Sequence, residues 1–239
     1  MMAFTTFGMF EPGGMESKML DMRIFLWPRS VSSQLTSRQV WPCEKTWAST
    51  SYSACMTSEI IPAFAAEFAR YRSLGERSAA QLTWPQLRTS LDPETNSIAV
   101  IMKHIGGNLR SRWTDALTTD GEKPWRNRDS EFIDDFADRE ALIAHWNTGW
   151  DAVESALASF TDADLTKTIY IRGEAHTLAL ALTRSLSHIA YHVGQIVQQA
   201  RVHASRADTA WQTLSIPRGG SAAFNTQKGF DPANPGASK

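Results

Sequence analysis

Residues 177–200 read TLALALTRSLSHIAYHVGQIVQQA and indicate the fold of the whole chain. Apolar side chains recur in this stretch at steps of three and four residues, as they do along one face of an amphipathic helix. Thr177 can accept a backbone N–H at the start of the stretch, so we expect a helix over about 177–204. His188 and His192 are four residues apart and therefore share one face of that helix, about one turn from each other.

The same periodicity predicts three earlier helices, over about 59–82, 95–117 and 138–159. Residues 168–171 alternate between polar and apolar side chains in the manner of a short strand. The polar segment 118–138 is longer than an ordinary connection, and loops of this length often carry function. Four helices joined by loops of this kind indicate an all-α fold, a four-helix bundle with long loops.

The two ends of the chain lack this helical periodicity. Prolines cut residues 1–55 into short pieces, whereas Met56 is followed at once by a sequence typical of a helix start. We therefore expect the bundle over 56–206. The first 55 residues are then either upstream sequence from a mis-assigned start or a disordered extension that can serve as a partner-binding arm. We expect an irregular, partly packed tail over 207–239.

The composition excludes several classes of protein. The 239 residues contain 24 Lys and Arg against 25 Asp and Glu, without the positive surplus that a nucleic-acid or acidic-membrane binder needs. No stretch approaches the roughly 18 apolar residues that span a bilayer. Cys43 and Cys55 are the two cysteines, so residues 56–239 are not a disulfide scaffold. The first residues do not resemble a signal peptide, and we expect a cytoplasmic protein that acts on a small molecule.

His104 lies among aliphatic residues in the middle of the expected second helix. Opposite His188 and His192, it would complete a set of three imidazoles in the bundle interior, where helical bundles build metal sites. Three histidines with an open position suit a catalytic divalent cation, Zn²⁺ first, because structural zinc sites usually recruit cysteine. The spacing leaves a second interpretation open, in which His104 is a core histidine hydrogen-bonded to a neighbour.

Three stretches carry a resemblance to a known family: NSIAVIMKHIGGNLRSRW at 96–113, TTDGEKPWRNR at 118–128 and HIAYHVGQI at 188–196. They resemble the DinB/YfiT-like metalloenzymes, and within them an uncharacterised bacterial branch. The resemblance extends over roughly 57–220 and leaves the first 55 residues unmatched.

This resemblance implies a four-helix bundle that holds one divalent metal on His104, His188 and His192, with Zn, Ni, Mn or Fe as the ion. Characterised relatives include bacillithiol S-transferases and a mycothiol-dependent isomerase, in which the metal activates a low-molecular-weight thiol. The resemblance therefore implies a thiol S-transferase-like enzyme, and it also implies a homodimer.

Asn108 and Arg112 follow His104 by four and eight residues and share its helix face. They are candidates for binding an anionic group of the thiol or the substrate. Packing at the edge of the core or a surface ion pair is the alternative role for both side chains.

Arg126 and Arg128 lie in the long loop and can bind the carboxylates of a thiol cofactor. In the alternative interpretation both arginines are solvated or paired with Asp129 and Glu131 of the same loop.

Gln195 follows His192 by three residues and either positions that imidazole or makes a hydrogen bond between helices. We expect His145, His176 and His203 to lie at helix ends, core edges or solvated faces, outside the metal site. The sequence assigns no catalytic residue.

Two other functions remain open at this stage. A hydrolase would use metal-bound water, although no obvious general base accompanies the histidines. A non-catalytic, stress-associated bundle would bind metal or a partner without any chemistry.

Overall fold

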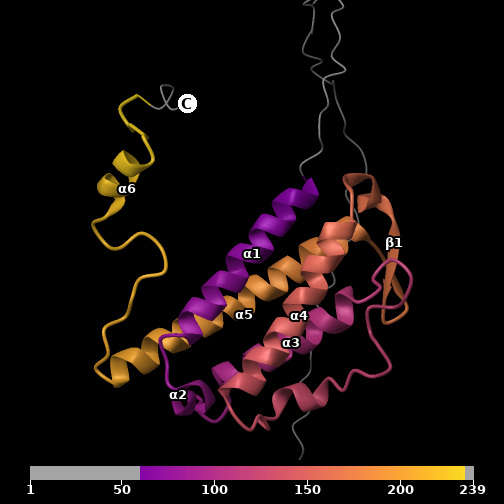
Figure 1. The fold of residues 1–239 in the computed structure, drawn as a ribbon, viewed down its shortest axis with the longest axis horizontal. Helices are drawn as coiled ribbons and strands as arrows, with labels where there is room; N and C mark the ends of the chain where they lie inside the picture. The colour runs from indigo at the N-terminus through magenta and orange to yellow at the C-terminus, as the bar shows by residue number, and fades with distance from the viewer. Residues whose placement is uncertain (1–59, 235–239) are drawn as a thin grey trace, which may run out of the picture. The chain divides into compact units, whose positions relative to one another are not determined.

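The computed structural model describes residues 60–234, so the expected extension over 1–55 and the expected start at Met56 lie outside the described residues. Within that range the long elements are all helices, and the all-α prediction is confirmed (Figure 1). The long helices are α1 (Ile60–Ala79), α3 (Ile98–Trp113), α4 (Arg139–Ser159) and α5 (Leu178–Arg206).

Side-chain caps explain where three of these helices begin. The Ser97 hydroxyl accepts the Val100 N–H at the start of α3, and Thr177 accepts the Leu180 N–H at the start of α5. Asp138 caps α4 in the same way. The expected range 95–117 was too long at both ends, because Ser97 fixes the start of α3 and Asp115 (φ 49°) lies just beyond its end, in the left-handed region.

The shorter elements are α2 (Trp84–Arg88), the 3₁₀ turns η1 (Asp129–Phe132) and η2 (Asp162–Thr166), the strands β1 (Thr168–Ile171) and β2 (Glu174–Thr177), and α6 (Ser221–Gln227). The sequence predicted β1 but not its antiparallel partner β2. It also missed α2 and α6, two short helices in segments that were expected to be irregular.

The hairpin β1–β2 turns at Arg172 and Gly173, whose φ angles are 55° and 75°. Positive φ at both central residues is the geometry of the tight type I′ turn, which favours glycine. The Asp120 carboxylate accepts the backbone N–H groups of Arg172 and Gly173 at 2.8 and 2.7 Å. This contact ties the loop after α3 to the tip of the hairpin.

The helices α3 and α4 approach so closely that their contact requires glycine. A Cβ on Gly149 would lie 2.4 Å from the carbonyl oxygen of Gly106, a distance that real Cβ atoms do not show. Around this contact the largest fully buried side chains are aromatic: Phe68, Trp113, Trp146 and Trp150. The helix α3 is therefore the central element of the core, and the site described below is built on it.

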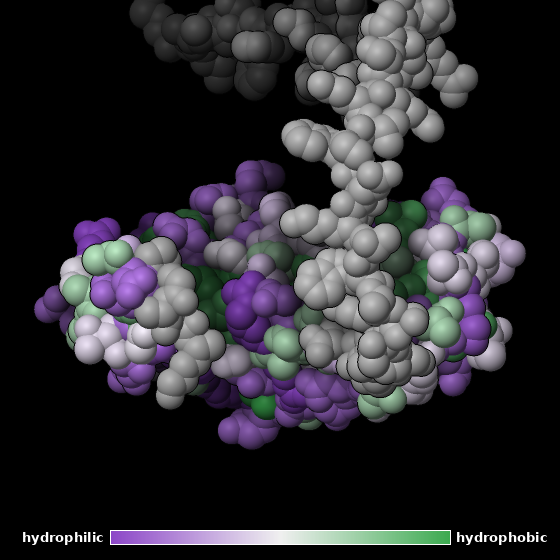
Figure 2. All heavy atoms as spheres, turned by 90° about the horizontal axis from the view of Figure 1, so that it is seen from above, coloured by the Kyte–Doolittle hydropathy of each residue, from purple (hydrophilic) through white to green (hydrophobic). Residues whose placement is uncertain are grey.

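On the part of the described surface that Figure 2 leaves uncovered, hydrophilic and hydrophobic residues are interspersed. Among residues 60–234 no helix has the length and apolar character needed to cross a membrane. In the tail, Trp211 packs partly buried against the core, and the Gln212 N–H donates to Gln81 at 2.8 Å.

Candidate metal centre

The structure brings together His104 from α3 with His188 and His192 from α5. The Nε2 atom of His188 lies 3.1 Å from the Nε2 atoms of both other histidines. One potential ligand atom from each ring lies within 4.8 Å of the other two. His104 is buried, whereas His188 and His192 are half-buried. These are the three histidines that the sequence analysis proposed as metal ligands, and the structure brings them together.

The outward nitrogens of two of these rings are held by oxygen acceptors. The Nδ1 of His104 donates to a carboxylate oxygen of Glu131 at 2.8 Å, and the Nδ1 of His192 donates to the amide oxygen of Gln195 at 2.8 Å. A neutral imidazole that donates through Nδ1 carries its lone pair on Nε2. Two lone pairs therefore point into the cluster, as a metal ion requires.

The same environment favours the neutral form of the two histidines on α5. Burial lowers the pKa of His188 to about 3, assisted by the neighbouring His192 and His104. Burial also lowers the pKa of His192, in opposition to its hydrogen bond with Gln195. Neutral imidazole is the form that binds metal, so these two rings do not have to lose protons near pH 7 to accept a cation.

Glu131 is the residue of this site that sequence reasoning missed as a partner of the histidines. It was considered only as an ion-pair partner of the loop arginines, whereas its side chain is 6% exposed and contacts His104. Gly107 makes room for it, because a Cβ at that position would lie 2.5 Å from a Glu131 carboxylate oxygen. A glycine three residues after a candidate ligand is the signal that could have indicated a close neighbour.

Arg126 neutralises Glu131 from the other side. Its guanidinium donates to the two carboxylate oxygens of Glu131 at 2.8 and 3.0 Å, and to Glu122 at 2.9 Å. Burial by itself raises the pKa of Glu131, but the hydrogen bonds from His104 and Arg126 outweigh it and lower the pKa. Glu131 therefore remains an anion that orients His104. The structure thus shows Arg126 in the ion pair that was its alternative role.

The other three candidate binding residues lie near the histidines in different ways. Asn108 and Arg112 line a cavity of about 360 Å³ together with His188. The Arg128 guanidinium lies over the Phe132 ring, 5.0 Å from its centroid, and that ring stacks on His104 at 4.9 Å.

The remaining histidines have other partners. The Nε2 of His145 lies 2.9 Å from the carbonyl oxygen of Lys103, and His176 contacts Arg184 from the strand β2. His203 is buried near the end of α5, where a core edge or solvated face was expected. None of the three belongs to the histidine cluster found among the described residues.

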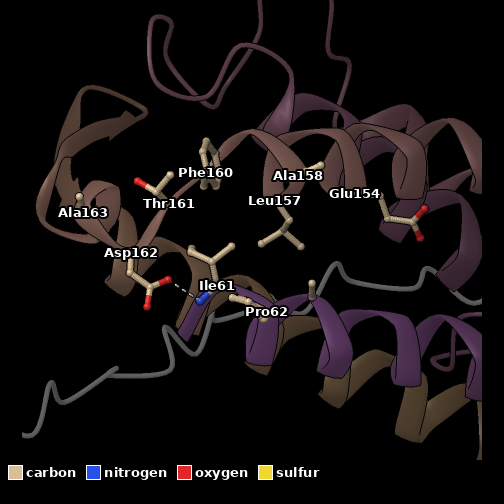
Figure 3. Close-up of a pocket in the computed structure, with 10 residues that line it drawn as sticks. Ile61, Pro62, Glu154, Leu157, Ala158, Phe160, Thr161, Asp162 and Ala163 are labelled. Carbon is tan, nitrogen blue, oxygen red and sulfur yellow. Dashed lines mark hydrogen bonds between the residues drawn. The ribbon is translucent and has the colours of Figure 1, made fainter. Parts of the chain in front are cut away.

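A second cavity beside the histidines has a volume of about 290 Å³ and is lined by His104 and His188. The larger cavity of Figure 3, about 740 Å³, is apolar and shares no lining residue with it. That larger cavity lies between the start of α1 and the end of α4, where Asp162 accepts the N–H groups of Ile60 and Ile61. The histidine cluster therefore borders the smaller cavity and not the larger one.

The fold and the site together define an all-α protein whose histidine cluster could hold a metal ion. The chain belongs to the family described as "Protein of unknown function (DUF1572)", whose model matches residues 56–220. No curated protein matches the chain. A solved structure described as a conserved protein from Enterococcus faecalis is similar at 16% identity and a TM-score of 0.47, covering 61% of this chain and 98% of that one.

Proposed function

We propose that this protein is a DinB-like, divalent-metal-dependent enzyme that activates a low-molecular-weight thiol for transfer to an electrophile. The observation that carries the proposal is the histidine cluster, in which His104, His188 and His192 direct Nε2 atoms toward one another. Glu131 and Gln195 hold two of the rings in the tautomer that binds metal. The resemblance of the helix and loop sequences to the DinB-like family supplies the reaction class.

The donor set fits a metal such as Zn²⁺. Two imidazole nitrogens at about 2.0–2.1 Å from a tetrahedral Zn²⁺ lie about 3.3 Å apart. The Nε2 atom of His188 lies 3.1 Å from its counterpart in each of the other two rings. Nitrogen ligands also suit Ni, Fe and Mn, so the ligands alone do not fix the ion.

A divalent ion with an open position would favour the thiolate form of a bound thiol and hold it beside an electrophile. The residues of the chain provide the setting for that step. Glu131 keeps the lone pair of His104 on Nε2, and the Phe132 ring covers one face of the same imidazole. Residues 56–239 contain no cysteine, so the proposed thiol has to come from outside the bundle.

Metal analysis of the purified full-length protein tests the first half of this proposal. The wild type should bind one equivalent of Zn²⁺, and His188→Ala should lose stoichiometric binding. His145→Ala is the matched control, because His145 lies on α4 outside the cluster and should leave the stoichiometry unchanged. Full metal occupancy in His188→Ala would overturn the proposal.

Activity assays test the second half. The metal-loaded protein should transfer at least one of several low-molecular-weight thiols to a generic electrophile, and chelation or His188→Ala should abolish the transfer. Metal-dependent ester hydrolysis without thiol transfer would instead identify the hydrolase. Stoichiometric metal with neither reaction would favour the non-catalytic bundle.

A further inference from the structure

The smaller cavity beside the histidines is unusually rich in arginine. Five arginines line it together with His104 and His188, and they come from α3, the long loop, the hairpin tip and α5: Arg112, Arg126, Arg128, Arg172 and Arg184. Glu174 is the one carboxylate among the residues that line it. The cavity therefore has a large excess of positive charge.

Two of these arginines are already engaged. Arg126 forms its ion pairs with Glu131 and Glu122, and its side chain is 3% exposed. Arg128 lies over the ring of Phe132. The charge of Arg126 is thereby balanced within the protein, so a ligand would have to be bound mainly by the other three arginines.

Arg112 has a donor without a partner. Its Nη1 atom is buried and makes no hydrogen bond within the part of the chain that the structure describes. Gly121 leaves space beside it, since a Cβ there would lie 3.0 Å from Nη1. Burial, and next the nearby Arg126, lower the pKa of Arg112 to about 10. A buried, unpaired donor is costly. Because Arg112 lines the cavity, an anion bound there would lie beside its guanidinium and compensate its charge.

Arg184 is held at the cavity by a neutral histidine. Arginine only donates hydrogen bonds, so the Nε2 of His176, which contacts the Arg184 guanidinium, must be the acceptor. The Nδ1 of His176 then donates to the Glu174 carbonyl oxygen at 2.9 Å. The contact positions the guanidinium without neutralising its charge.

Arg172 lies at the tip of the hairpin that Asp120 fixes to the loop. Its side chain is 56% exposed and lies 3.3 Å from a carboxylate oxygen of Glu122, a residue that also pairs with Arg126. Because this ion pair is exposed to solvent and Glu122 also pairs with Arg126, the Arg172 guanidinium can still bind another anion.

We propose that Arg112, Arg172 and Arg184 form an anion-binding subsite for a carboxylate or phosphate group of the substrate, with the substrate's reactive end at the three histidines. Guanidinium groups match both anions with paired hydrogen bonds. The cavity of about 290 Å³ indicates a small acid. The position of the reactive end rests on the proposed function, whereas the anion binding does not require a metal.

The test uses metal-stripped, full-length protein at constant ionic strength. Inorganic phosphate and succinate are titrated separately by calorimetry, and at least one of them should bind saturably. The double variant Arg172→Gln/Arg184→Gln should weaken that binding about tenfold or more, the range expected for lost charge-assisted hydrogen bonds. The matched control Arg201→Gln/Arg206→Gln makes the same charge change on exposed positions of α5 outside the cavity and should bind as the wild type does.

A preference for phosphate or for succinate identifies the anionic group, and binding of both also supports the subsite. The inference is overturned if neither anion binds saturably, or if the cavity variant binds as tightly as the control. Anion binding by a protein that fails to take up stoichiometric Zn²⁺ in the metal analysis would refute the proposed function and leave the subsite standing. Stoichiometric metal without anion binding would do the reverse.

Discussion

Replacement of Glu131 by glutamine tests how the histidine cluster is held. The Glu131 carboxylate accepts the Nδ1 proton of His104 at 2.8 Å, and both side chains are 6% exposed. Loss of such a carboxylate partner typically weakens metal binding about 10- to 100-fold, or about 1.4–2.8 kcal/mol. Glu131→Gln should therefore raise the dissociation constant for Zn²⁺ by that factor, as measured by competition with a chelator at pH 7.5.

The same variant should also destabilise the metal-free protein. Arg126 would lose two hydrogen bonds to a carboxylate while its side chain stays 3% exposed. Breaking a buried ion pair costs about 3–5 kcal/mol, and we expect a loss of about 3 kcal/mol because Glu122 still pairs with Arg126. Urea unfolding of the metal-free variant measures this loss of unfolding free energy separately from the metal affinity.

The matched control is Glu122→Gln, which removes the other carboxylate of Arg126 and does not touch His104. It should leave Zn²⁺ affinity within about threefold of the wild type, a difference of less than about 0.7 kcal/mol. The role assigned to Glu131 would be refuted if Glu131→Gln bound Zn²⁺ as tightly as the wild type, or if the two variants lost Zn²⁺ affinity equally.

Three further perturbations test other parts of the structure. The metal-free protein should lose about 1–2 kcal/mol of unfolding free energy when the pH falls from about 7.5 to about 5. The reason is that His188 takes up a proton below about pH 6.5 in the unfolded chain, whereas burial lowers its pKa to about 3 in the folded chain. Urea titrations at the two pH values should show this loss, and an equal pH dependence in His188→Ala would contradict it. Gly107→Ala should displace Glu131 and weaken Zn²⁺ binding, whereas Gly194→Ala, where an added Cβ meets nothing within 4 Å, should leave affinity unchanged. Trp150→Ala should destabilise the fold by about 3–5 kcal/mol in the same assay, since the side chain is fully buried, and a loss below about 1 kcal/mol would show that the core is packed differently.

The helices and the pair His188 and His192 could be predicted because their signals are local. His104, 84 residues from His188, was added to the pair from the bundle architecture and the family resemblance. Apolar periodicity located each long helix, and Thr177 marked the start of α5 through its side-chain oxygen. Spacing placed His188 and His192 on one face of a single helix. The prediction of β1 worked for the same reason, since its alternating pattern is visible in four residues.

The rest depends on contacts between distant segments. β2 has the sequence Glu-Ala-His-Thr, in which nothing distinguishes a strand from a loop until it pairs with β1. Glu131 lies 27 residues from His104, and their contact follows from the way the long loop folds back onto α3. Arg172 and Arg184 reach one cavity only through the hairpin and α5. The periodicity of a single helix or strand does not predict such contacts between distant residues.

X-ray absorption spectroscopy of the Zn²⁺-loaded, full-length protein tests the central claim most directly. The account predicts one bound ion with three imidazole nitrogens at about 2.0–2.1 Å and one further light ligand. Wild-type protein that holds no stoichiometric ion, fewer than three imidazoles in the spectrum, or a sulfur ligand at about 2.3 Å from Cys43 or Cys55 would contradict it.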